Sequence, residues 1–536
     1  MASDQEMVSI DSARRMTIGE MLARAARRTP ENRAYQVGER RVTYAEIDAR
    51  VDRLARALRQ RGVRKGDRVA VMLRNTLECV ESFFAVCRLG AITVPVNFRL
   101  VAAEVAHILQ DSGATALIAE EDLAPIVRTA LADDGALSTM LVVGDPGDLS
   151  ASARPQVANY ENALAEQSSL PLVVDMDESD PAFIMYTSGT TGKPKGAVLT
   201  HRNLVVNNFN LVAELSLTRS DEVRLSGTAL FHIAGLNGML YHLMAGGCSI
   251  ILETGDFDPV AVLDVMEREK VTSVSLVPTQ WRDVCRVAGE RERELSLRRM
   301  FWGTSSIPPS VLKDMFDTFP GVPVYALFGQ TEMSASTCML KSEDALAKFG
   351  SVGRPLVNVE ARIVDDEMRD VADGEVGEIV YRGPTVFKEY WNNPEETAEV
   401  FAGGWFHSGD LCRRDEDGFV FVMGRKKEMI ISGGENIYCQ EVEDALDSHP
   451  KVAQVAVVGV PHEKWVETPC AVVVPVDPGD PPTLEEIVGH CRSRLASYKK
   501  PTRLVVVEEF PRNAAGKIQR FRLKEQLAAA TGAGRR

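Results

Sequence analysis

The segment Tyr186-Thr-Ser-Gly-Thr-Thr-Gly-Lys-Pro-Lys-Gly196 lies between two short apolar runs, Phe183-Ile-Met185 and Val198-Leu199. Its glycines allow sharp turns that expose backbone N–H groups, and its two lysines add positive charge, so the segment has the ingredients of a phosphate-binding loop. It is not the Walker P-loop pattern, because Pro194 stands where that pattern requires Ser or Thr. A surface turn is the alternative, but the apolar runs on both sides favour a glycine-rich hairpin between strands.

The overall composition restricts the kind of protein that carries this loop and the partners it can bind. The chain has 536 residues, of which 45% are hydrophobic and 26% charged, which is typical of a folded protein with more than one core. Lys and Arg total 61 against 76 Asp and Glu, giving a formal net charge of −15. This acidic balance argues against nucleic acid or an anionic membrane as a partner. A small anionic ligand could still bind where cations are gathered locally.

Cysteine usage and the N-terminus indicate the compartment. The nine cysteines form no CxxC pair and no zinc-binding spacing, which favours reduced core thiols in a cytosolic protein. The first residues lack a basic start followed by an apolar stretch, and no apolar run approaches the roughly 20 residues that span a bilayer. We therefore expect a cytoplasmic protein without a transmembrane segment.

The order of apolar runs predicts the fold class. Residues 69–73 and 91–96 are predicted strands on either side of a predicted helix at 77–89, and this alternation recurs along the chain, as parallel sheets require. Further on, 375–382 and 419–422 are predicted to be short, partly antiparallel strands. We expect an α/β protein: a large N-terminal domain of parallel-rich α/β subdomains with a small barrel-like β part (1–424), and a small α+β C-terminal domain (428–536).

The glycine-rich segment resembles a family signature. Thr187-Ser-Gly-Thr-Thr-Gly-Lys-Pro-Lys195 is similar to the phosphate loop of the adenylate-forming superfamily, which comprises acyl- and aryl-CoA synthetases, peptide-synthetase adenylation domains and luciferases. Further motifs follow in the same order along nearly the whole chain, most like those of bacterial fatty-acid and aryl acid–CoA ligases. The resemblance implies nucleotide contacts for Thr187, Ser188, Gly189, Thr190, Thr191, Gly192 and Lys195, with Thr187 and Lys195 also catalytic.

A second motif completes the implied nucleotide site. Leu327-Phe-Gly-Gln-Thr-Glu332 resembles the family segment that places an aromatic ring on adenine, a threonine on the α-phosphate and a glutamate on magnesium. A carboxylate is the oxygen ligand that Mg²⁺ prefers, so Glu332 suits the metal and catalytic role. An ordinary strand-end turn is the alternative. The resemblance implies nucleotide contacts for Phe328, where the family more often has Tyr, and for Gly329, Gln330 and Thr331.

Two segments bear on the acyl group and the thiol. Leu230-Phe-His-Ile-Ala-Gly235 resembles the segment whose aromatic residue lies between the acyl pocket and the thiol tunnel, which implies a catalytic gate at His232; a buried core histidine is the alternative. Phe301-Trp-Gly-Thr-Ser-Ser-Ile307 occupies a position where the family usually has a Gly-Ala-Ala-Pro-like sequence. Gly303 fits the nucleotide site, whereas Trp302 departs from the pattern and is expected to contact the acyl group.

The C-terminal motifs imply a second set of contacts and a hinge. Trp405-Phe-His-Ser-Gly-Asp410 resembles the segment whose Asp binds the ribose hydroxyls, and Arg425 matches a ribose- and phosphate-contacting arginine. Residues 425–427 would form the hinge, with Lys427 at the hinge position and a mobile domain after it. Ser432, Gly433 and Gly434 would approach coenzyme A, and Lys517, within 511–520, would be the adenylation lysine.

The resemblance implies an ATP-dependent acid–CoA ligase that uses Mg²⁺. A carboxylic acid would attack ATP to give acyl-AMP and pyrophosphate, and coenzyme A would then displace AMP. Charge gathers around phosphorus in the first step, so catalysis would rest on positioning and electrostatic stabilisation. Two alternatives stay open: a family member that carries out only one half-reaction, and a non-catalytic nucleotide- or acyl-binding protein. The partner is a small carboxylic acid of unidentified class; a homodimer is left open.

Overall fold

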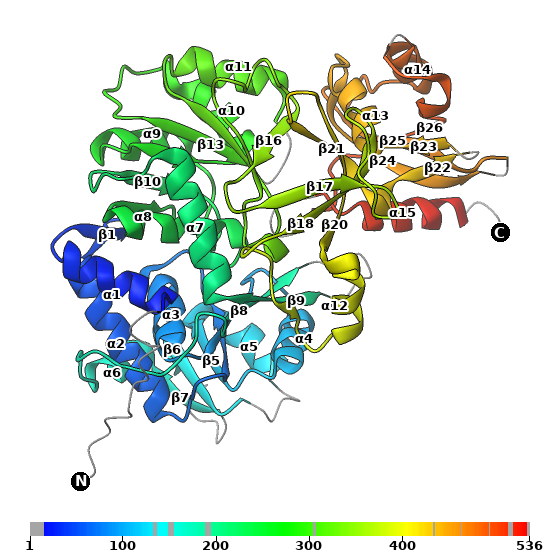
Figure 1. The fold of residues 1–536 in the computed structure, drawn as a ribbon. Coiled ribbons are helices and arrows are strands. Elements are labelled where there is room, and N and C mark those ends of the chain that lie inside the picture. Colours follow the sequence, from blue (N-terminus) through cyan, green and yellow to red (C-terminus); the bar gives the residue numbers. More distant parts are fainter. Residues whose placement is uncertain are drawn as a thin grey trace. The chain divides into compact units, whose positions relative to one another are not determined.

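The computed structural model describes residues 15–131, 137–147, 155–187, 194–303, 307–432, 435–462, 464–492, 494–512 and 518–532. The chain forms two compact units (Figure 1). The first comprises Met1–Phe349, Gly353–Glu360 and Arg382–Ala402, and the second Gly350–Val352, Ala361–Tyr381 and Gly403–Arg536. Each unit is described by itself.

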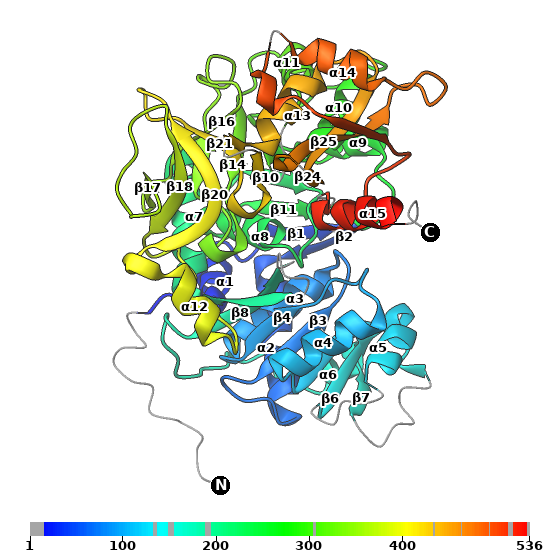
Figure 2. The ribbon, with the colours of Figure 1, turned by 90° about the vertical axis from the view of Figure 1, so that its right-hand side faces the viewer.

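The first unit contains an eight-stranded sheet in the order β19-β9-β8-β4-β3-β5-β6-β7. Strands β7, β6, β5, β3, β4 and β8 run parallel, whereas β9 is antiparallel to β8 and β19 is antiparallel to β9. Helices pack along the parallel part (Figure 2). The bounds are β3 Arg68–Met72, β4 Ile92–Pro95, β5 Ala116–Glu120, β6 Thr139–Val143, β7 Gln156–Asn159, β8 Pro181–Thr187, β9 Lys195–Thr200, β19 Glu389–Tyr390, α2 Tyr44–Gln60, α3 Leu77–Arg88, α4 Ala102–Ser112, α5 Ala124–Ala130 and α6 Tyr160–Ala165.

The second sheet has 13 strands, and those that belong to this unit run in the order β15-β14-β13-β12-β10-β11-β1-β2, parallel from β14 to β1. Helices α9, α10 and α11 cover one face, where Leu225, Val274 and Met300 pack with Trp281 and Met315. The bounds are β1 Arg33–Val37, β2 Arg40–Thr43, β10 Val223–Ser226, β11 Cys248–Ile251, β12 Ser273–Ser275, β13 Arg299–Gly303, β14 Val324–Phe328, β15 Cys338–Leu340, α1 Ile18–Arg28, α7 His201–Leu215, α8 Ile233–Ala245, α9 Pro259–Arg268, α10 Pro278–Ala288, α11 Pro309–Thr318 and α12 Pro394–Val400.

The second unit is built on antiparallel strands. Strands β17, β18, β20 and β21 are neighbours in that order, and a five-stranded sheet follows in the order β23-β22-β25-β24, with β26 parallel to β25. Helices α13 and α14 cover one face of this sheet and α15 the other. The bounds are β16 Ser351–Pro355, shared between the units, β17 Glu360–Val364, β18 Val376–Arg382, β20 Phe406–Arg414, β21 Val420–Arg425, β22 Ile430–Ser432, β23 Glu435–Ile437, β24 Val452–His462, β25 Val466–Pro475, β26 Arg503–Val506, α13 Cys439–Asp447, α14 Leu484–Cys491 and α15 Arg520–Gly532.

The predicted fold class is confirmed: parallel-rich α/β sheets are followed by a small C-terminal α/β domain. All nine cysteines are free, and eight of them are buried. The second compact unit also takes in β17, β18, β20 and β21, so it begins before residue 424. The division at 424 and the hinge at 425–427 stay predictions.

The start of α2 offers a test of the local sequence rules. Thr43 Oγ1 accepts a hydrogen bond from the Glu46 backbone N–H (3.2 Å), and Glu46 Oε2 accepts one from the Thr43 N–H (2.8 Å), which forms a capping box. Thr43→Ala removes one partner and should lower the free energy of opening of α2 by about 1 kcal/mol. Hydrogen exchange of the α2 amides measures this change. Thr43→Ser keeps the hydroxyl and should preserve the protection; an equal loss in both variants would contradict the capping role.

Candidate active site

Several predicted residues lie at the carboxyl ends of parallel strands in the first unit. Gly303 ends β13 and Phe328 ends the neighbouring β14, with Gly303 paired to Leu327 in register. His232 follows β10, which belongs to the same parallel set. The carboxyl ends of neighbouring parallel strands meet at one edge, the usual place for ligand sites in α/β sheets. Thr187 likewise ends β8 in the other sheet.

Two predicted glycines lie where a side chain would collide with backbone. A Cβ on Gly303 would lie 2.6 Å from the Leu327 carbonyl oxygen, and one on Gly329 would lie 1.8 Å from that of Ala335. Ser334 and Ala335 adopt φ angles of 61° and 102°, so the chain folds tightly back after the predicted magnesium ligand. Gly329 therefore permits the close turn around residues 329–335, and Gly303 permits the close approach of β13 to β14.

A polar cluster links two predicted catalytic residues through a tyrosine. Glu332 is 9% exposed, and its Oε1 accepts a hydrogen bond of 2.9 Å from the Tyr390 hydroxyl. The Lys195 Nζ lies 5.6 Å from the centre of the Tyr390 ring and forms an ion pair with Glu396 Oε1. The structure thus brings Lys195 and Glu332 to one place, although they are 137 positions apart in the sequence.

Strand pairing explains this arrangement. Tyr390 of β19 lies opposite Ala197 of β9, and Lys195 is two residues before Ala197, so the Lys195 and Tyr390 side chains lie on the same face. Asn393 caps α12 by accepting a hydrogen bond from the Glu396 N–H (3.2 Å), which places Glu396 in the first turn of that helix. The Phe387 N–H donates to the Glu332 carbonyl (2.8 Å) and ties the two loops together.

Sequence reasoning missed Tyr390 and Glu396. Both lie in a short segment with a two-residue strand and a seven-residue helix, outside every quoted motif. The available signal was the Asn393-Pro394 helix start, one residue after the aromatic pair Tyr390-Trp391. That signal predicts a helix at this position. It does not predict which strand β19 pairs with, because β9 lies some 190 residues earlier in the chain.

The predicted acyl and thiol residues of this unit have structural contacts of their own. His232 is the N-cap of α8, and its Nδ1 accepts a hydrogen bond from the Ala234 N–H (3.3 Å). Trp302 is half-buried and packs against the apolar cluster under α9–α11. Phe231 packs edge-on against Phe98, with ring centres 5.6 Å apart. The gate role of His232 and the acyl contact of Trp302 stay predictions.

In the second unit the two predicted ribose-binding residues form an ion pair. Asp410 of β20 lies opposite Arg425 of β21, and Arg425 Nε lies 2.7 Å from Asp410 Oδ1. Asp410 is 4% exposed, and its N–H donates to Ser408 Oγ (3.0 Å), while Arg425 Nη1 donates to the Ser408 carbonyl (3.2 Å). The pair holds an ionised carboxylate in a fixed position.

The predicted residues after Arg425 differ in their contacts and exposure. Lys426 pairs with Asp366 (2.8 Å) and Glu378 (3.3 Å), and its hydrogen bond to Asp366 is the main cause that raises the pKa of Lys426. Lys427 is exposed and lies in a single 3₁₀ turn, Lys426–Glu428. Ser432 is buried at the end of β22.

Part of the predicted site lies outside the described residues: Ser188, Gly189, Thr190, Thr191, Gly192, Gly433, Gly434 and Lys517. For two of these segments, the described residues on either side of the segment pair with each other. Thr187 lies opposite Lys195 in the antiparallel β8–β9 pair, which fits the predicted hairpin, and Arg512 forms an antiparallel bridge with Ile518.

No cluster of three or more His, Cys, Asp or Glu side chains is placed to hold a metal ion within the described ranges. A magnesium site at Glu332 would therefore use this one carboxylate together with ligands from the substrate and water, as Mg²⁺ commonly does. Among the helices that the structure describes, none has the length and apolar character needed to cross a bilayer.

Comparison with known proteins agrees with this arrangement. The profile of the AMP-binding enzyme family matches residues 22–391, and that of the AMP-binding enzyme C-terminal domain matches residues 441–517. A feruloyl-CoA synthase from an Amycolatopsis species is 39% identical over 515 residues, 96% of this chain and 100% of that protein. A long-chain-fatty-acid–CoA ligase from Mycobacterium tuberculosis is 34% identical over 517 residues, 96% of this chain and 99% of the other.

A solved structure shows the same fold over nearly the whole chain. O-succinylbenzoate coenzyme A synthetase from Bacillus subtilis, in complex with ATP and magnesium ion, matches with a TM-score of 0.82 at 31% identity, covering 95% of this chain and 99% of the other. The chain belongs to the AMP-binding enzyme family, the adenylate-forming superfamily that its motifs resemble. Within it the chain is an AMP-forming acid–CoA ligase that acts through an acyl-adenylate.

The Tyr390–Glu332 hydrogen bond generates a direct test. Tyr390→Phe keeps the ring beside Lys195 and removes only the hydroxyl that donates to Glu332. A hydrogen bond to a charged group contributes about 1.5–3 kcal/mol, so acid-dependent pyrophosphate exchange should fall by about tenfold or more. Steady-state exchange rates at saturating ATP measure the effect.

The matched control is Tyr160→Phe in α6 of the same unit. It also removes a tyrosine–glutamate hydrogen bond, from Tyr160 OH to Glu81 Oε2 (2.8 Å), but this bond lies outside every motif. Exchange should be retained in this variant. Equal losses in the two variants would mean that Tyr390 acts through stability alone.

Proposed function

We propose that this ligase activates an aromatic carboxylic acid and that the Lys195–Tyr390–Glu332 cluster is the phosphate and magnesium end of its nucleotide site. The hydrogen bond from Tyr390 to Glu332 is the observation that carries the proposal. It fixes the orientation of a buried carboxylate while occupying only one of its two oxygens, and an ionised carboxylate has capacity for further contacts. The carboxylate thus fits a hard divalent cation.

Magnesium, when bound, would polarise the phosphate oxygens of ATP. The role of Lys195 then follows from its contacts: Glu396 neutralises it in this structure, and a phosphate would compete for the same ammonium group. Asp410, held by Arg425, would accept hydrogen bonds from the ribose hydroxyls. Thr187 and Thr331 would contribute hydroxyl donors to the phosphates, and Phe328 would stack on adenine.

Lys517 and the C-terminal domain would separate the two half-reactions. In adenylation, Lys517 would stabilise the charge that gathers around the α-phosphorus as the substrate carboxylate displaces pyrophosphate. Rotation at Lys427 would then withdraw Lys517 and bring the Ser432–Gly434 side to the adenylate, and coenzyme A would enter beside His232 and expel AMP. Domain alternation would let one cavity serve both reactions by gating.

The aromatic class is supported by the identity pattern. The feruloyl-CoA synthase shares 39% of its residues with this chain and the long-chain-fatty-acid–CoA ligase 34%, over the same share of the chain. Incubation with ATP, Mg²⁺ and coenzyme A should yield AMP and an aryl-CoA from a panel of cinnamic and arylacetic acids. Their kcat/KM should exceed that of long-chain fatty acids by about tenfold or more, which needs about 1.4 kcal/mol of differential binding. A preference for fatty acids would overturn the aromatic assignment but would leave the acid–CoA ligase activity standing.

The role of Lys517 is testable by separating the half-reactions. Lys517→Ala should reduce acid-dependent pyrophosphate exchange by about 100-fold or more, because it removes a charge that stabilises the transition state. Conversion of a synthetic aryl-AMP to aryl-CoA should persist in the same variant.

Lys426→Ala is the control, because Lys426 is held by Asp366 and Glu378. It should keep both half-reactions. If both half-reactions fall together in Lys517→Ala, or if Lys426→Ala reproduces its loss, the assigned role of Lys517 is wrong.

A further inference from the structure

One face of the second sheet carries a row of polar residues that the ligase function does not use. Ser249, Arg224, Ser273 and Arg299 are neighbours in register across β11, β10, β12 and β13. Their side chains share one face, because residues paired in a parallel sheet point the same way, and the next residues along the strands pack into the apolar cluster on the opposite face. The row lies toward the amino ends of the strands, whereas the candidate active site lies at their carboxyl ends.

Helix α8 closes over Arg224. The guanidinium carbon lies 5.5 Å from the centre of the Tyr241 ring, and a Cβ on Gly238 would lie 2.6 Å from Arg224 Nη2. A side chain at position 238 would therefore collide with the guanidinium. Arg224 is 4% exposed, so it is a buried cation packed between the sheet and the helix.

Arg224 has no ion pair with a carboxylate anywhere in the described part of the chain, and its Nε is without a hydrogen-bond partner. The hydroxyls of Ser249 and Ser273, which flank it in the row, are buried and equally unpartnered. Arg224 also hydrogen-bonds the Tyr241 hydroxyl through its side chain, but its Nε and the two serine hydroxyls on the adjacent strands are buried without a partner. Native structures seldom leave buried polar groups in this condition.

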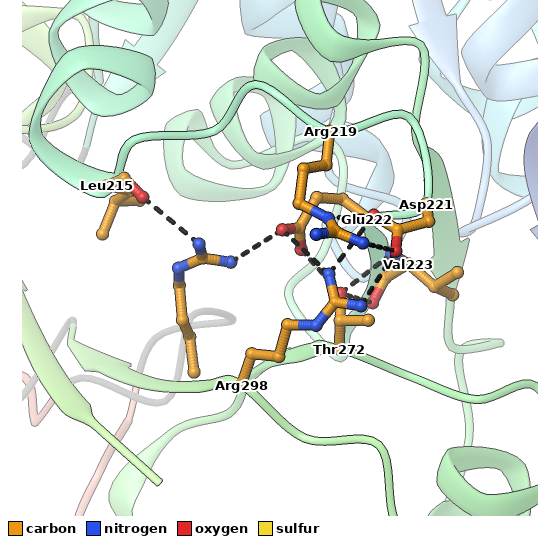
Figure 3. A network of polar contacts seen from close by, with 8 residues as sticks. Leu215, Arg219, Asp221, Glu222, Val223, Thr272 and Arg298 are labelled. Atoms are coloured by element: carbon orange, nitrogen blue, oxygen red, sulfur yellow. Dashed lines mark hydrogen bonds and ion pairs between the residues drawn. The ribbon is translucent and has the colours of Figure 1, made fainter.

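The two carboxylates directly before β10, Asp221 and Glu222, pair with other arginines (Figure 3). Asp221 pairs with Arg219 (2.6 Å) and Arg298 (2.9 Å). Glu222 pairs with Arg299 (3.0 Å), and Thr272 Oγ1 donates to its Oε2 (2.7 Å). Two carboxylates therefore pair with three guanidinium groups, and Arg224 is not one of them.

The surroundings of Arg224 are electropositive. Burial is the main cause that lowers the pKa of the nearby His242 well below its usual range, and the charges of Arg224 and Arg299 lower it further. A buried charge without a counter-ion costs several kcal/mol, so such a group normally pairs with an opposite charge. His242 cannot supply one, since an imidazole is either neutral or positive.

We propose that Arg224, Ser249 and Ser273 form a binding site for a small monovalent inorganic anion, of which chloride is the physiological example. A guanidinium and two hydroxyl donors are the groups that complement a spherical anion, and the contact with the α8 backbone at Gly238 favours a small ion over phosphate or sulfate. The anion neutralises Arg224 and holds α8 against the sheet. It is a structural ion, separate from the nucleotide and acid.

Bromide is the direct probe. Crystals of the full chain soaked in bromide should show an anomalous peak within hydrogen-bonding distance of Arg224 and between the two serine hydroxyls. An Arg224→Met crystal treated in the same way should lack it. Only water density at this position in the wild-type protein would overturn the proposal.

Thermal unfolding in solution gives an independent test. Replacing sodium gluconate by sodium bromide at constant ionic strength should raise the midpoint for wild type by about 2–4 °C, because a ligand of the native state stabilises it by mass action. Arg219→Met changes an exposed arginine of the adjacent network and should keep this rise. Arg224→Met should abolish it, and the same rise in Arg224→Met would overturn the site.

If Arg224→Met fails to fold, Ser249→Ala and Ser273→Ala replace it in the test. Each removes one donor to the anion and should raise the bromide concentration that gives half of the shift by about tenfold. An unchanged concentration in both serine variants would contradict the site.

Discussion

The antiparallel pairing of β19 with β9 is the constraint on which the candidate catalytic centre depends. A two-residue strand places Tyr390 opposite Ala197, and from there its ring lies beside Lys195 and its hydroxyl holds Glu332. Without this pairing, the hairpin lysine and the buried glutamate would have no shared partner. Alternation of side chains along the strands makes the arrangement specific, because a slip by one residue would turn Tyr390 to the other face.

The sheets provide the frame for this centre. Parallel strands gather their carboxyl ends at one edge, and the absence of side chains at Gly303 and Gly329 lets adjacent backbone segments approach closely there. In the second unit, β20 and β21 hold Asp410 and Arg425 as a fixed pair. These contacts orient the side chains before substrate binds, as electrostatic stabilisation of adenylate chemistry would require.

The sequence allowed a good prediction of the elements and a partial one of the site. Apolar runs such as 69–73 and the Thr43–Glu46 capping box have local causes, and the structure has β3 and the start of α2 there. The resemblance predicted a ribose contact for both Asp410 and Arg425, and the structure shows that they form an ion pair. Tyr390 and Glu396 could not, since their importance arises from a long-range strand pairing. The sequence around Arg224 is that of an ordinary strand, and only the strand register shows that Arg224 lies between two serines.

The central claim is that Tyr390 acts through Glu332, and a double-mutant cycle on adenylation tests it most directly. Acid-dependent pyrophosphate exchange would be measured for wild type, Tyr390→Phe, Glu332→Gln and the double variant. If Tyr390 serves to orient the Glu332 carboxylate, removing its hydroxyl should have little further effect once Glu332 is Gln, so the two losses should be strongly non-additive. Losses that simply multiply would contradict the account and would show that the two residues act independently.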